Sequence, residues 1–124
     1  MSWKIGDNGF SMTLSSSAPE LIKLHLRQFL NDWLQSLNLR REDISAWAIH
    51  PGGARILDAV GQALNLTDID LKFSRHVLQQ YGNMSSPTVL FVLDEIRDQL
   101  GCVPTVVLAF GPGLTIEAAY LAGE

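Results

Sequence analysis

A histidine and an asparagine, two residue types that can donate an N–H hydrogen bond, stand beside glycines in this 124-residue chain. His50 ends the apolar run 44–49 and precedes two glycines, and Asn83 directly follows another glycine. A histidine at the end of a strand is a candidate catalytic residue by its type. By residue type alone, His50 could instead bond only to nearby backbone, and Asn83 could simply provide a turn with positive φ.

The composition narrows the class of protein. With 47% apolar and 18% charged residues, residues 1–124 suit one globular domain with one core. The net charge is −4 and the basic residues are scattered, so we expect no nucleic-acid partner. No apolar stretch approaches the roughly 20 residues of a membrane span, and the N-terminus does not read as a signal peptide. We therefore expect no membrane partner and a cytoplasmic location.

The chain has a single cysteine, Cys102. It cannot form an intramolecular disulfide, and the cysteine clusters of structural zinc sites are absent, so we expect no metal. A lone cysteine is more often a small buried hydrophobe than a reactive thiol. We therefore expect Cys102 to be buried and not to act as a nucleophile.

The spacing of apolar residues predicts alternating strands and helices. Segments with apolar residues every three or four positions are predicted helices: residues 19–37, 56–64, 71–80 and 87–96. Short apolar or alternating runs are predicted strands: residues 10–14, 44–49, 104–110 and 114–121. Helices that can cover both faces of buried strands indicate a layered α/β domain. The helix over 87–96 is almost wholly apolar, so we expect it to be deeply buried.

Three blocks at the ends of these elements resemble, in order and spacing, the C-terminal domain signature of chalcone and stilbene synthases. These enzymes are type III polyketide synthases of the thiolase superfamily. The blocks are Trp-Ala-Ile-His-Pro-Gly-Gly at 47–53, Tyr-Gly-Asn-Met-Ser-Ser at 81–86 and Phe-Gly-Pro-Gly-Leu-Thr-Ile-Glu at 110–117. The resemblance runs from about residue 9 to residue 121. It implies an α/β fold, a thiolase-like half with helices layered on a mixed five-stranded sheet.

The resemblance implies a reaction on CoA thioesters without a further cofactor. His50 and Asn83 match the residues that hold the thioester carbonyl of malonyl-CoA while it loses CO₂ and becomes an enolate. The enolate then condenses with an acyl starter derived from a second CoA thioester. In this family the histidine also pairs with a nucleophilic cysteine. That cysteine belongs to an N-terminal half, upstream of everything this chain resembles, and Cys102 lies outside any matching block.

Further positions are implied to bind substrate, although each also suits a plain turn or core residue. Those near the CoA arm are Gly52, Gly53 and Arg55. Those that shape the cavity are Met12, where plant relatives carry a gatekeeper phenylalanine, together with Ser85, Phe110, Gly111, Pro112 and Gly113.

Two alternatives to a working synthase half stay open. The chain could be a catalytically silent fragment or self-associating domain, which is the outcome we expect for the isolated chain. A ketoacyl synthase III-like enzyme would also use a histidine and an asparagine, but the glycine-rich blocks fit it poorly. A half separated from its partner would expose an apolar helix face, so we expect self-association, as a homodimer. Acyl-CoA and malonyl-CoA are expected as partners only where a matching N-terminal half is present.

Overall fold

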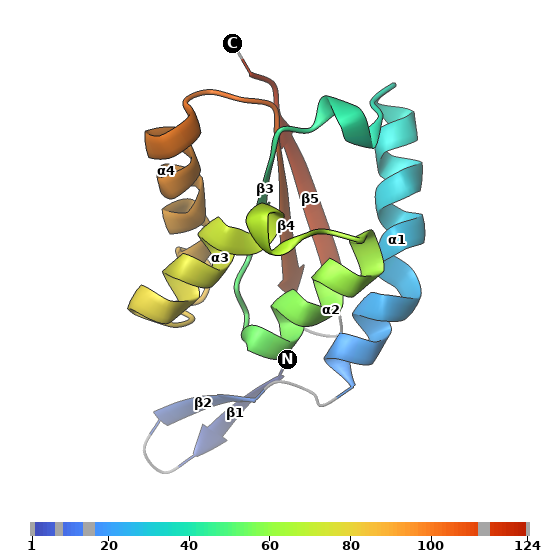
Figure 1. The fold of residues 1–124 in the computed structure, drawn as a ribbon. Helices are drawn as coiled ribbons and strands as arrows, with labels where there is room; N and C mark the ends of the chain where they lie inside the picture. The colour runs from blue at the N-terminus through green and yellow to red at the C-terminus, as the bar shows by residue number, and fades with distance from the viewer. Residues whose placement is uncertain (1, 7–8, 14–16, 112–114, 124) are drawn as a thin grey trace.

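The computed structural model describes residues 2–6, 9–13, 17–111 and 115–123, the first two segments by their backbone alone (Figure 1). Its strands are β1 (Ser2–Gly6), β2 (Gly9–Thr13), β3 (Ala46–Ile49), β4 (Thr105–Gly111) and β5 (Thr115–Leu121). Its helices are α1 (Ala18–Ser36), the short 3-10 helix η1 (Arg41–Asp43), α2 (Ala54–Leu64), α3 (Asp68–Tyr81) and α4 (Thr88–Leu100). No helix in the described part of the chain is long and apolar enough to cross a membrane.

The strands form two sheets. β1 and β2 pair as an antiparallel hairpin, while β3, β4 and β5 form a three-stranded sheet in that order. β3 runs parallel to β4, and β5 runs antiparallel to it, so this sheet is mixed. The prediction of one five-stranded sheet is not confirmed, because the strands of the described residues divide between the two sheets.

Helices cover both faces of the three-stranded sheet, as the layered α/β prediction requires (Figure 1). Successive side chains of a strand point to opposite faces. Trp47 and Ile49 accordingly pack in one core cluster with α1 and α2, whereas Ala46 and Ala48 pack in a second cluster with α3 and α4. All four residues of β3 are buried, so the strand that leads into His50 is held from both sides.

Two helices differ in extent or burial from their predictions. α3 begins at Asp68, three residues earlier than apolar periodicity indicated, because a capping box between Thr67 and Asp70 stabilises a polar first turn. α4 is not deeply buried. Only Thr88, Val92 and Ile96, which are spaced four residues apart, are buried. The opposite face of the helix is open, and Leu90 on it is 62% exposed.

The stripe of α1 that faces the sheet should dominate its contribution to stability. Leu30 is fully buried, whereas Leu24 of the same helix is 72% exposed. We expect Leu30→Ala to lower the free energy of unfolding by about 2–5 kcal/mol, through lost transfer energy and a cavity. Leu24→Ala, the matched control, should change it by no more than about 0.5 kcal/mol. Urea denaturation followed by circular dichroism measures both, and equal losses would contradict this packing.

Candidate active site

His50 lies directly after β3, at the edge of the sheet where the parallel strands β3 and β4 both end. Its backbone N–H donates to the Leu108 carbonyl oxygen at 2.8 Å, which continues the β3–β4 ladder by one residue. Gly52 N–H then donates to the His50 carbonyl oxygen at 2.9 Å and turns the chain toward α2. The backbone of His50 is thus fixed on β4 before the loop begins.

The His50 imidazole is largely buried but still reaches the surface. The residue is only 7% exposed, and burial lowers the pKa of His50 below its ordinary value of 6.5. Within the described residues, the ring makes no hydrogen bond or ion pair. Every fully buried side-chain nitrogen in the same residues does have a hydrogen-bond partner. The ring nitrogens must therefore touch the surface. The alternative for His50, a ring bonded to nearby backbone, is therefore not found among the described residues.

Asn83 lies beside the His50 loop. Its side-chain Nδ2 donates to the Gly52 carbonyl oxygen at 3.5 Å, a long hydrogen bond, and its Oδ1 accepts from Ser85 N–H at 3.0 Å. Because Ser85 occupies the amide oxygen, the NH₂ group faces the loop that carries His50. The structure thus brings together two loops that are separated by α2 and α3 along the chain.

Asn83 is not the positive-φ turn residue that its type alone allowed. Among the described non-glycine residues, positive φ occurs at Asn38, Asn65 and Ser85, the last with φ of 64°. Gly82, with φ of 71°, ends α3 just before Asn83. The turn is therefore made by the residues around Asn83, and its side chain is left to bond across to the neighbouring loop.

The other predicted positions differ in exposure and in the elements that carry them. Gly53 has open space where a Cβ would stand, and Arg55 is exposed on the first turn of α2. Ser85 is exposed beside Asn83. Phe110 packs in the core cluster with α1 and α2, and Gly111 ends β4.

Three predicted positions receive no side-chain description. Met12 belongs to β2 and pairs with Trp3 in the separate hairpin, and its backbone alone is described. Pro112 and Gly113 lie outside the described residues. Their parts in shaping a cavity stay predictions.

Two buried hydroxyl groups near the pair were missed by the sequence analysis. Ser74 and Thr88 are fully buried, and both bond to the backbone of the loops just described. Ser74 shares the apolar stripe of α3 with Leu71 and Val77, at three-residue spacing. A polar residue on a buried stripe is the signal that could have found it.

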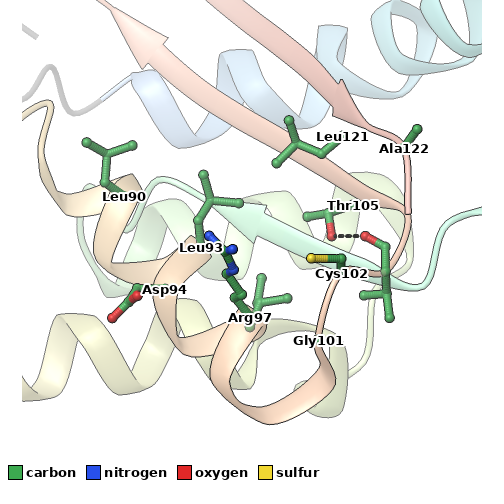
Figure 2. Close-up of a pocket in the computed structure, with 11 residues that line it drawn as sticks. Leu90, Leu93, Asp94, Arg97, Gly101, Cys102, Thr105, Leu121 and Ala122 are labelled. Carbon is green, nitrogen blue, oxygen red and sulfur yellow. Dashed lines mark hydrogen bonds between the residues drawn. The ribbon is translucent and has the colours of Figure 1, made fainter. Parts of the chain in front are cut away.

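Cys102 lines a pocket at the opposite end of the sheet from His50, outside the candidate site. The volume of the pocket is about 430 Å³, and Leu90 and Leu93 of α4 face Leu121 across it, with Cys102 on the loop before β4 (Figure 2). Cys102 is exposed, so the expectation that it is buried was wrong. Thr105 pairs with Ala46 at this end of the sheet, whereas His50 follows Ile49 at the other. Cys102 therefore does not meet His50.

A family model, a sequence relative and a solved structure all match this chain over nearly its full length. The family model described as "Chalcone and stilbene synthases, C-terminal domain" matches residues 1–123. The chain is 37% identical to a 1,3,6,8-tetrahydroxynaphthalene synthase of Streptomyces peucetius subsp. caesius, over 98% of this chain and 33% of that protein. A crystal structure of PKS-I from the brown alga Ectocarpus siliculosus superposes with a TM-score of 0.91 at 32% identity, over 99% of this chain and 35% of that one. The chain therefore spans about a third of the length of each.

The lowered pKa of His50 predicts a pH dependence of stability. As the pH falls below about 6.5, the unfolded chain takes up a proton that the folded chain still excludes, so the free energy of unfolding falls. His50→Gln should remove this part of the fall, as measured by urea denaturation at about pH 5.5 and about pH 7.5. His25→Gln, at an exposed position of α1, is the control. An unchanged pH dependence in His50→Gln would contradict the effect of burial.

Proposed function

The chain belongs to the chalcone and stilbene synthase family as a C-terminal domain, and we propose that it forms part of a type III polyketide synthase. In this proposal, residues 1–124 are a single domain that contributes His50 and Asn83 to the decarboxylative condensation of malonyl-CoA onto a CoA-derived acyl starter. The observation that carries it is the hydrogen bond from Asn83 to Gly52, which places an amide donor beside the histidine loop.

The proposed chemistry is stabilisation of an enolate oxygen. When malonyl-CoA loses CO₂, the electron pair of the broken C–C bond enters the new C=C bond, and the thioester oxygen takes the negative charge. A neutral His50 ring offers one N–H, and Asn83 offers an NH₂ group whose bond to Gly52 is long and easily exchanged for a better acceptor. Donors held in a partly buried site stabilise this charge more than the neutral thioester.

The nucleophile must come from outside these residues. Cys102 lies at the other end of the sheet, so the starter acyl group needs a different thiol. We propose that an N-terminal half, corresponding to the part of the longer relatives that this chain does not match, supplies this thiol. Without that half the chain is expected to be catalytically silent.

The remaining predicted positions are proposed to bind the substrate without a further cofactor. Arg55 is exposed on the turn of α2 that follows the His50 loop, where a guanidinium can bind a phosphate of CoA. Gly53 has open space beside its backbone on that path, whereas Gly52 is buried and a Cβ there would contact the side chains of His50 and Ile56. Met12, Ser85 and the segment 110–113 are proposed to shape the cavity. A cytoplasmic location also stays a prediction.

A chimera tests the proposed reaction. This chain would replace the matching third of the Streptomyces relative, and CoA release from malonyl-CoA would be measured with an acyl-CoA starter. We expect the chimera to be active and the chain alone to be inactive. His50→Gln or Asn83→Asp should each lower the chimera's rate by about two to three orders of magnitude, the usual effect of losing one such donor.

The control for the chimera is Cys102→Ala, which should leave the rate unchanged. If the isolated chain were active and Cys102→Ala abolished that activity, the assignment of the nucleophile to another half would be overturned. An active chimera that tolerated both His50→Gln and Asn83→Asp would overturn the roles proposed for these two residues.

The open face of α4 supports self-association as a second proposal. Its exposed apolar side chains include Leu90 and Phe91, and the ring of Phe91 lies 5.2 Å from that of Tyr81, which is also exposed. Leu121 extends the face across the pocket. Apolar surface gathered in this way is typical of an interface. We propose that two copies of the isolated chain cover it as a homodimer.

Light scattering after size exclusion tests the homodimer at tens of micromolar chain. The parent chain should elute as a dimer, and Leu90→Asp should shift it to a monomer because a carboxylate would be buried in the interface. Leu24→Asp, at an exposed leucine of α1 away from this face, should leave the dimer intact. A monomeric parent chain would contradict the proposal.

A further inference from the structure

Ser74 on α3 and Thr88 at the start of α4 are hydroxyl residues without any exposed surface. Each hydroxyl makes two hydrogen bonds, one as donor and one as acceptor, and all four partners are backbone atoms. A buried polar group is tolerated where its bonds are made. These particular bonds all go to the segments that carry His50 and Asn83.

Ser74 fixes the peptide that joins β3 to His50. Its Oγ donates to the Ile49 carbonyl oxygen at 2.8 Å and accepts from Ile49 N–H at 3.2 Å. The Ile49 carbonyl belongs to the same peptide unit as His50 N–H, which donates to the Leu108 carbonyl oxygen on β4 at 2.8 Å. The peptide is thus held on both sides, by a strand and by a side chain. Because the His50 ring makes no hydrogen bond in the described structure, its position depends on this backbone and on packing.

Thr88 holds the turn that orients Asn83. Its Oγ1 accepts from Met84 N–H and donates to the Ser85 carbonyl oxygen, both at 2.7 Å. Between these two bonds, Ser85 adopts a φ of 64°, a left-handed conformation that a serine rarely takes without support. Ser85 N–H in turn binds the Asn83 side-chain oxygen. The Ser85 carbonyl oxygen also accepts from the Thr88 backbone N–H at 3.0 Å, so removing the hydroxyl would loosen the turn rather than abolish it. The loosened turn would no longer hold the Asn83 NH₂ group firmly toward the histidine loop.

We propose that Ser74 and Thr88 are positioning residues for the His50–Asn83 pair, one for each loop. Neither hydroxyl is exposed, so neither touches substrate; each acts through the backbone that carries a donor. The consequence for catalysis rests on the proposed function. The consequence for the geometry of the two side chains does not, because it follows from the free chain.

The test compares variants that remove a hydroxyl with variants that keep it. Thr88→Val preserves the shape of the side chain and removes both hydrogen bonds, whereas Thr88→Ser keeps them. Ser74→Ala removes the other hydroxyl. Thr105→Val is the matched control, since Thr105 is also buried and its hydroxyl donates to Val103, at the end of β4 away from His50.

Nuclear magnetic resonance of the ¹⁵N-labelled chain reads the geometry without any substrate. Thr88→Val should shift the Asn83 side-chain amide signals and speed hydrogen exchange at Met84 N–H by about tenfold or more. Thr88→Ser should restore both. Ser74→Ala should shift the His50 imidazole signals, while Thr105→Val should leave the signals of His50 and Asn83 in place.

The chimera with the Streptomyces relative then reads the effect on the reaction. Thr88→Val should lower kcat by up to about a hundredfold with little change in KM for malonyl-CoA, and Thr88→Ser should recover most of the loss. Asn83 and His50 signals that stayed in place in Thr88→Val and Ser74→Ala would overturn the proposal. So would moved signals with an unchanged kcat. A chimera that was inactive even with the parent chain would instead count against the proposed function, while the resonance data would still decide the positioning.

Discussion

The parallel pairing of β3 with β4 is the constraint on which the rest of the structure depends. Parallel strands cannot be joined by a tight turn, so the chain between them must cross over the sheet. Here the crossover contains α2, α3 and α4, and it carries the Asn83 loop back to the edge where β3 ends at His50. The same pairing binds His50 N–H to Leu108. One choice of strand direction therefore places both candidate donors.

Local features of this fold could be predicted from the sequence, and features that depend on distant neighbours could not. The strand before His50 and the long helix α1 follow from runs and stripes of apolar residues, which any segment shows by itself. The division of the strands into two sheets depends on pairing between segments far apart in the chain. The burial of α4 likewise depends on what covers it: Leu90 and Val92 are both apolar, and only packing against the sheet separates them.

The candidate site shows the same limit. The resemblance identified His50 and Asn83, but residue type alone also allowed a turn asparagine and a backbone-bonded histidine. The φ angles resolve the first alternative, since Ser85 rather than Asn83 takes the left-handed conformation. Ser74 is marked by its place on the apolar stripe of α3, but neither its type nor that of Thr88 indicates what the hydroxyl binds. Those partners are backbone atoms of other segments, which no pattern within α3 or α4 specifies.

The electrostatics of His50 also depend on what stands beside it. Burial lowers the pKa of the His50 ring and so favours its neutral form, which can donate one N–H. A thiolate brought next to the same ring would favour the protonated form and oppose burial. In the proposed reaction, the histidine would then stabilise the thiolate as well as the enolate oxygen. A nucleophile from another half would thus complete the site chemically and also change the protonation of a residue already in place.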